Sequence, residues 1–174
     1  MNAIECRDIV KSFGDPPLVV LKSISLSIGQ GDFVGITGRS GSGKSTLLYV
    51  TSGLDGLTSG EVLLSGKNIH DFNSEELHHF RNRRMGFVFQ FHYLLPELTA
   101  LENILMPARK FKEEKKRTKY ALSLMKEFDV LHCKDKIPSK MSGGEMQRTA
   151  IARSLIMDPE LLFADELTGN LDSE

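Results

Sequence analysis

Glycine, serine and lysine residues that could bind phosphate are concentrated in one short stretch. It reads Gly38-Arg39-Ser40-Gly41-Ser42-Gly43-Lys44-Ser45-Thr46. Glycines allow the backbone to wrap around a polyphosphate, so that successive N–H groups and the N-terminus of the next helix point at the anion. We expect Lys44 to hold the β- and γ-phosphates and the Ser45 hydroxyl to be a ligand for Mg²⁺. The alternative, a flexible serine- and glycine-rich turn, is disfavoured by the Lys44-Ser45 pair.

Polar residues follow two apolar runs farther along the chain. Asp165 and Glu166 come directly after the run at 161–164, and Gln90 comes directly after the run at 87–89. Polar residues at the carboxyl ends of strands are where α/β sheets bind ligands. We expect Asp165 to complete the Mg²⁺ site. An ordinary surface role for the two carboxylates is disfavoured, because adjacent acids after a buried strand are costly without a cation.

The segment 142–145 predicts the start of a helix. Ser142 and Glu145 have capping-box spacing, and Gly143 and Gly144 lie between them. A helix N-terminus with two glycines is also a binding site for an anion. The structural and the functional interpretations therefore agree here. The residues that continue the helix are Gln147, Ala150, Ile151 and Leu155.

Hydrophobic patterns predict the elements that position the glycine-rich stretch. Ile24, Leu26 and Ile28 alternate with polar residues, as in a half-buried strand. The continuous run at 33–36 is typical of a strand covered on both faces, and it leads into the glycines. The run at 47–50 continues as a helix. Strand, turn and helix would thus occur in the order that a phosphate loop requires.

The pattern becomes helical between Gln90 and Ser142. Thr99 and Glu102 have capping-box spacing. The apolar residues that recur at helical intervals are Tyr120, Leu124, Phe128 and Leu131. We therefore expect a helical insert within an α/β core. The lysine- and glutamate-rich stretch 110–119 could be a phosphate-binding patch, but its mixed charges favour a solvated helix face.

Composition limits the class of protein. The chain has 174 residues and a net charge of −1 with both signs interspersed, so we expect one domain and no bulk attraction to nucleic acid or anionic lipid. Cys6 and Cys133 lie far apart, as expected of reduced thiols. The five histidines lack a metal-binding pattern, which favours solvated or core roles. No apolar run approaches the length of a membrane helix and no signal peptide is apparent, so membrane association would come through a partner.

The order of three motifs resembles the ATP-binding cassette of ABC transporters: the glycine loop, then Ser142-Gly143-Gly144-Glu145, then Asp165-Glu166. The resemblance implies an α/β fold of the P-loop NTPase type, with a mixed sheet, an antiparallel β part and a helical subdomain. It implies one ATP-binding domain over 1–174, with a core at 1–90 and 150–174 and a helical subdomain at about 91–149. ATP and Mg²⁺ are the implied cofactors.

The same resemblance implies roles for individual residues. Glu166 resembles the catalytic base that polarises water for attack on the γ-phosphate. Gln90 is similar to a glutamine that contacts the metal or water and relays the nucleotide state to membrane subunits. Ser142 through Glu145 would meet the γ-phosphate of ATP held by a second copy of the chain. Glu145 stands where many relatives have glutamine. Phe13 is similar to the aromatic residue that stacks on adenine, with a core phenylalanine as the alternative.

The stretch 90–103 resembles the ATP-binding subunit of lipoprotein-releasing (Lol-type) transporters. Its sequence is Gln90-Phe91-His92-Tyr93-Leu94-Leu95-Pro96-Glu97-Leu98-Thr99-Ala100-Leu101-Glu102-Asn103. This likeness implies a peripheral, dimeric subunit on the cytoplasmic side of a bacterial inner membrane, docked on transmembrane permease subunits that expel lipoproteins. Macrolide-exporter and cell-division relatives share pieces of the stretch and the ending Thr168-Gly169-Asn170-Leu171-Asp172, so they remain alternatives.

Two departures from the family pattern lie near the end of the chain. None of the five histidines follows Asp165, so the family's switch histidine and the central strand that it ends are absent from this sequence. We therefore expect a C-terminally truncated cassette, and a non-catalytic nucleotide-binding remnant is a competing interpretation. Leu167 stands where the family usually has proline. Coiled-coil DNA-repair ATPases are disfavoured, because Lys44 and Ser142 leave no room between them for a long coiled coil.

Overall fold

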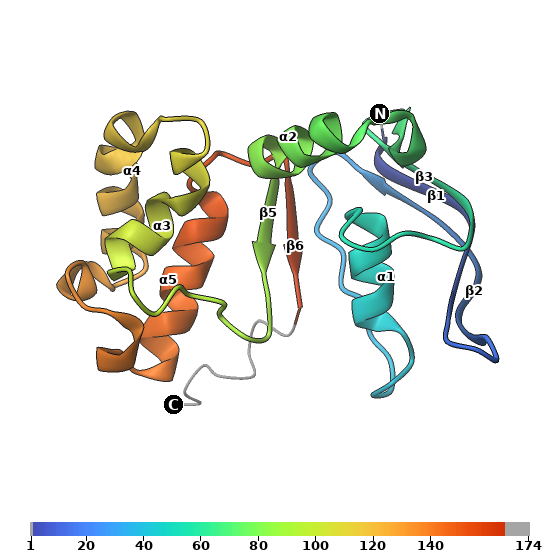
Figure 1. Ribbon diagram of the computed structural model, residues 1–174, viewed down its shortest axis with the longest axis horizontal. Coiled ribbons are helices and arrows are strands. Elements are labelled where there is room, and N and C mark those ends of the chain that lie inside the picture. The colour runs from blue at the N-terminus through green and yellow to red at the C-terminus, as the bar shows by residue number, and fades with distance from the viewer. Residues whose placement is uncertain (1, 166–174) are drawn as a thin grey trace. The chain divides into compact units, whose positions relative to one another are not determined.

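The structure is a computed structural model that describes residues 2–165 (Figure 1). Its chain forms two compact units, Met1–His79 and Phe80–Glu174. Helix α2 (Ser74–Arg84) contains the point at which one unit passes into the other. Glu166, and the sequence motif that follows it, lie outside the described residues.

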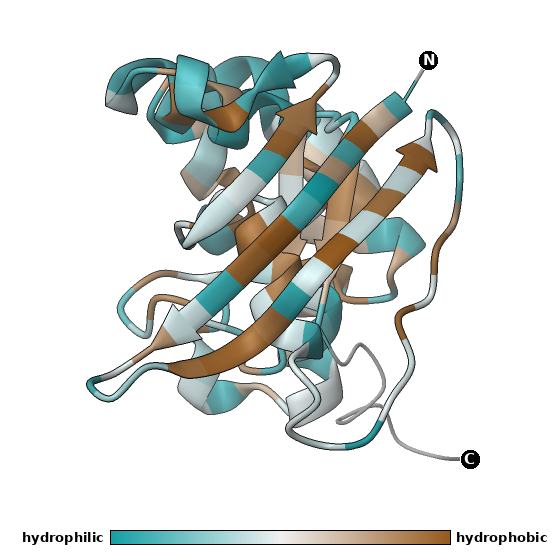
Figure 2. Cartoon of the chain, turned by 90° about the vertical axis from the view of Figure 1, so that its right-hand side faces the viewer, coloured by the Kyte–Doolittle hydropathy of each residue, from teal (hydrophilic) through white to brown (hydrophobic). Residues whose placement is uncertain are grey.

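The first unit is built on an antiparallel sheet. Its strands are β1 (Asn2–Phe13), β2 (Leu18–Gly29), β3 (Ser59–Leu64) and β4 (Lys67–Asn68), in the spatial order β2-β1-β3-β4. Figure 2 shows apolar and polar residues interspersed along the three long strands. The predicted strand around Ile24, Leu26 and Ile28 is confirmed, since these side chains are half-buried in β2 while Ser25 and Ser27 are exposed. The antiparallel β part is therefore present as expected.

The strand predicted at 33–36 does not form. These residues adopt no regular structure, and Phe33 is 98% exposed. Val34 and Ile36 are exposed as well. A parallel strand is stabilised by hydrogen bonds to neighbouring strands on its edges. In the described part of the chain no strand pairs with 33–36, and the apolar run alone cannot supply such a partner.

A helix follows the glycine-rich stretch, as predicted. Helix α1 (Lys44–Thr51) buries Leu47, Leu48 and Val50. A short 3-10 helix, η1 (Ile69–Asp71), follows β4. The fully buried apolar side chains of this unit come from the sheet and α1, and they are Ile9, Leu21, Val50, Val62 and Leu64. The helix that follows the phosphate loop is thus held against the sheet by its buried apolar side chains.

In the second unit, two short strands pair in parallel. They are β5 (Met85–Val88) and β6 (Leu161–Ala164), with Val88 opposite Ala164. Strand β6 coincides with the apolar run at 161–164, whereas β5 begins before the run at 87–89 and ends at Val88, so Phe89 lies outside it. A side chain at Gly86 would come within 2.4 Å of the Ser154 carbonyl oxygen, so only glycine fits at this point of the strand. Because Val88 lies opposite Ala164, the residues that follow the two strands begin at the same end of the strand pair.

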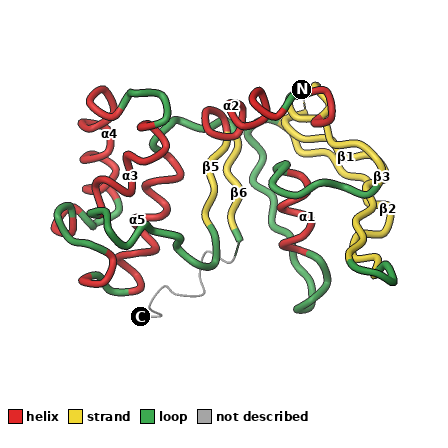
Figure 3. The backbone as a smooth tube through the Cα atoms, viewed as in Figure 1, coloured by secondary structure: helices red, strands yellow, loops and turns green. Residues whose placement is uncertain are grey.

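The rest of this unit is helical, which confirms the predicted helical insert (Figure 3). Its α-helices are α3 (Ala100–Arg109), α4 (Glu114–Glu127) and α5 (Gly143–Leu155). The 3-10 helices η2 (Leu131–Cys133) and η3 (Pro138–Lys140) connect α4 to α5. The fully buried side chains between them include Ile104, Met125, Val130, Cys133 and Ile156.

Helix α4 ends before the apolar pattern does. Tyr120 and Leu124 lie within it, but Phe128 is its C-cap and Leu131 belongs to η2. Asp129 has a φ of 53°, a left-handed conformation typical of the residue after a helix end. Lys115, Lys116 and Lys119 on α4 are exposed, as expected of a solvated face. Over the described residues, no helix is both long enough and apolar enough to cross a membrane.

Candidate nucleotide-binding site

Glycine geometry shapes the turn that leads into α1. Gly43 is the N-cap of α1 and has a φ of 94°, which favours glycine. A side chain at this position would also come within 3.1 Å of Val20 Cγ1. Because glycine has no side chain, it cannot cap the helix with one. The turn that precedes α1 is exposed, and an exposed turn at the N-terminus of a helix is an arrangement that binds anions.

Lys44 lies over this turn. Its Nζ donates hydrogen bonds to the carbonyl oxygens of Gly38 and Arg39, each at 3.1 Å. The backbone N–H of Ser42 donates to the Arg39 carbonyl at 3.2 Å and closes the turn. A phosphate oxygen is a stronger partner for an ammonium group than a neutral carbonyl is. The structure thus brings together the predicted loop residues Gly38, Arg39, Ser40, Gly41, Ser42, Gly43, Lys44, Ser45 and Thr46.

Phe13 lies at the end of β1 and is 43% exposed. This exposure excludes the alternative of a core phenylalanine. Lys11 Nζ lies 4.7 Å from the centre of the Phe13 ring and also binds the Asp55 carboxylate at 2.7 Å. One face of the ring is therefore held against a cation. An exposed aromatic ring can stack on a nucleotide base.

Gln90 and Asp165 follow the carboxyl ends of β5 and β6, which lie at the same end of this strand pair. The backbone N–H of Asp165 donates to the Val88 carbonyl at 2.9 Å, which extends the ladder by one residue. Gln90 is exposed and comes two residues after Val88. Both residues offer oxygen atoms, the ligands that Mg²⁺ prefers. Ser45, the third predicted metal ligand, belongs to the other unit, and Glu166 lies outside the described residues.

The capping box at the start of α5 is confirmed. The Glu145 N–H donates to Ser142 Oγ at 3.2 Å, and the Ser142 N–H donates to Glu145 Oε2 at 2.7 Å. Thr99 and Glu102 form the second predicted capping box, at the start of α3. Ser142 and Gly143 are exposed while Gly144 is buried. The N-terminus of α5 therefore presents backbone N–H groups and a hydroxyl near the surface.

Glu145 has further partners. The Cys133 thiol donates to its Oε1 at 3.0 Å, and His132 Nε2 lies 2.7 Å from the same oxygen. These bonds, together with the Ser142 N–H, hold the pKa of the Glu145 carboxyl far below its usual range; the thiol bond has the largest effect. Lys136 Nζ, at 3.6 Å, acts in the same direction. The lowered pKa favours the charged form of Glu145 at neutral pH.

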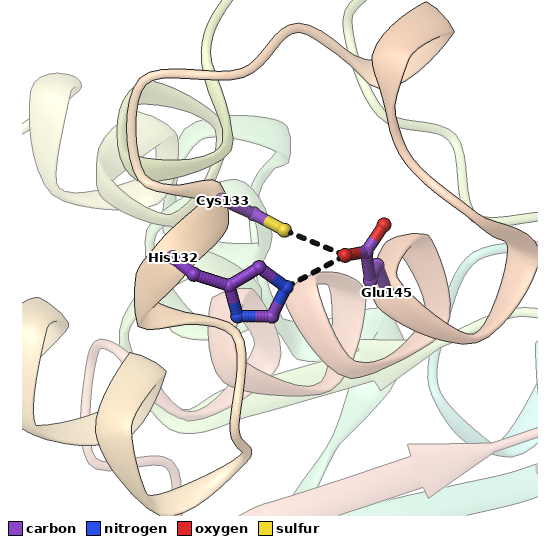
Figure 4. A group of neighbouring side chains, drawn as sticks. All are labelled: His132, Cys133 and Glu145. Atoms are coloured by element: carbon purple, nitrogen blue, oxygen red, sulfur yellow. Dashed lines mark hydrogen bonds and ion pairs between the residues drawn. The ribbon is translucent and has the colours of Figure 1, made fainter.

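One group of side chains bears on the expectation that the histidines have solvated or core roles. The His132 side chain is 54% exposed, as expected of a solvated histidine, and the potential ligand atoms of His132, Cys133 and Glu145 all lie within 4.8 Å of one another (Figure 4). The signal in the sequence was the adjacent His-Cys pair. It could not be interpreted alone, because the third ligand comes from a different helix.

Two residues that sequence reasoning passed over organise the segment after Gln90. Arg153 on α5 donates to the carbonyl oxygens of Tyr93 and His92, at 2.6 and 2.7 Å. Asn103 on α3 is buried and exchanges hydrogen bonds with the backbone of Leu95, at 2.7 and 3.1 Å. The segment is therefore fixed to two helices. The apolar side chains that it leaves exposed are Phe91, Tyr93 and Leu95.

The phosphate-loop turn and the capped glycine-rich helix are explained by a known family. Residues 21–169 match the family described as ABC transporter. The match covers most of the chain, so this protein belongs to the ABC transporter family.

Its relatives are named more specifically. The protein from Leptospira interrogans (serogroup Icterohaemorrhagiae, serovar Lai) named lipoprotein-releasing system ATP-binding protein LolD is 51% identical over 172 residues. The alignment covers 99% of this chain and 72% of that protein. The protein of the same name from Aquifex aeolicus is 56% identical over 158 residues, which cover 88% of this chain and 69% of the relative. This chain is thus similar to LolD proteins over most of their length.

Solved structures show the same fold. A dimeric structure of MJ0796, described as a bacterial ABC transporter cassette, aligns with a TM-score of 0.88 and 38% identity, covering 97% of this chain and 76% of that one. A post-hydrolysis dimer of the ATP-binding cassette MJ0796 bound to ADP and Pi gives a TM-score of 0.87 and 36% identity, covering 98% and 76%. The predicted fold, an ABC ATPase of the P-loop type, is confirmed.

Proposed function

We propose that this chain is the ATP-binding and ATP-hydrolysing subunit of a bacterial ABC transporter that powers the release of lipoproteins from the inner membrane. One observation carries the proposal. Four proteins named for this system are 43–56% identical to the chain over 88–99% of its length. Identity at this level extends through both units, so the likeness is more than the phosphate loop that many nucleotide-binding proteins share.

ATP is the proposed nucleotide. The MJ0796 cassette, which has the same fold, is described with ADP and Pi bound. In this chain the loop 38–46 would wrap the phosphates, with Lys44 moving its ammonium group from the two carbonyls to phosphate oxygens. Phe13 would stack on the adenine through its exposed face.

Mg²⁺ is the proposed metal, with Ser45, Gln90 and Asp165 as the residues that would hold it. The fit rests on chemistry, because all three offer oxygen atoms and Gln90 and Asp165 leave the same edge of the β5–β6 pair. When bound, the ion neutralises charge on the β- and γ-phosphates. Glu166 is the proposed base that orients the attacking water.

A second copy of the chain is the proposed partner at the nucleotide. Both MJ0796 structures are described as dimeric. Ser142, Gly143, Gly144 and Glu145 would present the N-terminus of α5 to the γ-phosphate of ATP held by that copy. The capping box supports this role, because it fixes Ser142 while leaving it exposed.

Transmembrane permease subunits are the proposed second partner, and they would hold the chain at the cytoplasmic side of the inner membrane. Phe91, Tyr93 and Leu95 form an exposed apolar surface on a segment that Arg153 and Asn103 fix in place. A fixed apolar patch is a typical protein interaction site. Lipoprotein would be moved by the permease and would not contact this chain.

The proposed function is tested by reconstitution. The chain is co-expressed with its membrane subunits, and the complex is placed in vesicles that contain a lipoprotein. We expect ATP to release the lipoprotein to a soluble acceptor, with no release in the Lys44→Ala complex. ATP hydrolysis stimulated by a macrolide but not by lipoprotein would favour the exporter alternative. Nucleotide binding without hydrolysis in any complex would indicate a non-catalytic protein.

A further inference from the structure

A group of three side chains lies beside the first turn of α5. Two of them, His132 and Cys133, have no part in the proposed ATP chemistry, and the third, Glu145, belongs to the proposed γ-phosphate site through the start of its helix. We propose that His132, Cys133 and Glu145 form a binding site for a thiophilic divalent cation such as Zn²⁺. Two of the residues are adjacent on η2, and the third is on α5 (Figure 4). Imidazole, thiolate and carboxylate are the ligand types that zinc uses in proteins.

The geometry is close to that of a zinc site. His132 Nε2 and Cys133 Sγ lie 2.7 and 3.0 Å from the same oxygen, Glu145 Oε1. Around a tetrahedral zinc ion such atoms would lie roughly 3.4–3.6 Å apart, as the usual bond lengths require. The His132 and Cys133 ligand atoms would therefore move away from Glu145 Oε1 by roughly 0.5–0.9 Å, and the three ligand atoms, which now lie within 4.8 Å of one another, would settle at these separations around the ion. The His132 side chain is 54% exposed, so solvent can reach the group and supply water as a fourth ligand.

The surrounding contacts orient the carboxylate for this role. Glu145 Oε2 accepts the Ser142 N–H, which leaves Oε1 as the atom that faces η2. Outer contacts of this kind fix the orientation of a metal ligand. On binding, the Cys133 thiol would release its proton to solvent. Thiolate and carboxylate together then balance the two positive charges of the ion.

The positive charge of Lys136 would repel a cation bound at this site. Its Nζ lies 3.6 Å from Glu145 Oε1, which is also the proposed ligand atom. A cation at this distance repels a second cation. The Lys136 side chain is partly exposed and can turn away into solvent. The site would therefore bind metal more weakly than the three ligands alone would allow, and removal of the lysine charge should strengthen it.

The same contacts could serve only as hydrogen bonds that support the cap of α5. The test therefore uses Co²⁺, whose bond to a thiolate gives a charge-transfer absorption that oxygen ligands do not give. The full chain is titrated with Co²⁺ in the absence of nucleotide and Mg²⁺. We expect one Co²⁺ per chain with this absorption, and its displacement by Zn²⁺.

Matched variants separate the two interpretations. Cys133→Ser keeps a hydrogen-bond donor for Glu145 but should abolish the absorption, whereas Cys6→Ser, at the other buried cysteine, should keep it. His132→Gln changes an exposed side chain and should weaken Co²⁺ binding at least about tenfold. Lys136→Gln should tighten it. Circular dichroism checks that each variant is folded.

Thermal unfolding gives a second measurement. Zn²⁺ should raise the Tm of the wild-type chain and of Cys6→Ser, but not that of Cys133→Ser, because an ion that binds the folded state stabilises it. Absence of the thiolate absorption in the wild type, or an equal absorption in Cys133→Ser, would overturn the proposal. Neither result depends on ATP hydrolysis, so failure of the metal-site proposal would leave the proposed transport function unaffected.

Discussion

At the scale of single residues, the most informative contact is that of Lys44 with two carbonyl oxygens of its own turn. The contact keeps a flexible charged side chain over the loop in the free protein. A preorganised cation loses less conformational freedom when a phosphate arrives. We therefore expect the same lysine to affect both the affinity for ATP and the rate of turnover.

Replacement of this lysine is the first prediction. In Lys44→Ala, ATP affinity should fall and hydrolysis should decrease by roughly 10²–10³-fold, since a charged donor to the transferred phosphate is lost. Fluorescent-ATP binding and phosphate release measure the two effects. Lys22→Ala changes an exposed lysine on β2 and serves as the control. Equal hydrolysis in the two variants would contradict the role given to Lys44.

Glu145 provides a prediction about pH. Its folded-state pKa is depressed, so its contribution to stability is fully present above the ordinary glutamate pKa of about 4.3 and is lost as pH falls toward the folded value. Urea unfolding of the wild type and of Glu145→Gln should therefore differ most at pH 7 and progressively less below about pH 4. A difference that is constant with pH would show that the charge of Glu145 does not stabilise the fold.

At the scale of elements, α3 and α5 begin in the same way and are expected to act differently. Each has a capping box, with Thr99 and Glu102 in one and Ser142 and Glu145 in the other. Only α5 continues from its cap into two glycines, so only its N-terminus is open to an anion. The two helices therefore allow a comparison in which the capping box is the same and only the two glycines differ.

That pair gives the third prediction. Ser142→Ala and Thr99→Ala should each lose roughly 0.5–2 kcal/mol of stability, the usual cost of an N-cap hydroxyl. Only Ser142→Ala should also abolish ATP hydrolysis, while nucleotide binding by a single chain is retained. Urea unfolding, phosphate release and fluorescent-ATP binding are measured on both variants. Loss of nucleotide binding in monomeric Ser142→Ala would refute the proposed role toward the second copy.

At the scale of the whole molecule, the proposed catalyst contains two chains. The loop 38–46 and the first turn of α5 would act on different ATP molecules, so a monomer would bind nucleotide without completing either site. Turnover should therefore depend on the concentration of the chain. The two MJ0796 structures, which have this fold, are described as dimers.

Glu166→Gln is the prediction at this scale. The variant should bind ATP and accumulate as a dimer, while turnover falls by roughly 10²–10⁴-fold because the proposed base is lost. Size-exclusion chromatography with ATP detects the dimer, and phosphate release from the reconstituted complex measures turnover. Unchanged phosphate release would remove Glu166 from the mechanism.

Local features were predictable because local physics determines them. The caps at Thr99 and Ser142, the helix after the glycine loop and the strand β6 appeared where residue spacing indicated them. Strand β5 overlaps its apolar run but ends one residue before it. The segment 33–36 was predicted wrongly as a strand. Its apolar run is sufficient for burial, but a strand also depends on hydrogen bonds to a neighbour that no local pattern specifies.

The sequence by itself determined the family and the candidate residues of the phosphate loop, because those depend on residue types at short spacing. Only the tertiary structure decided that Phe13 is exposed and that Arg153 holds the segment after Gln90. It alone brought His132 and Cys133 to the carboxylate of Glu145. These features involve side chains from different elements, so they depend on how whole helices and strands pack.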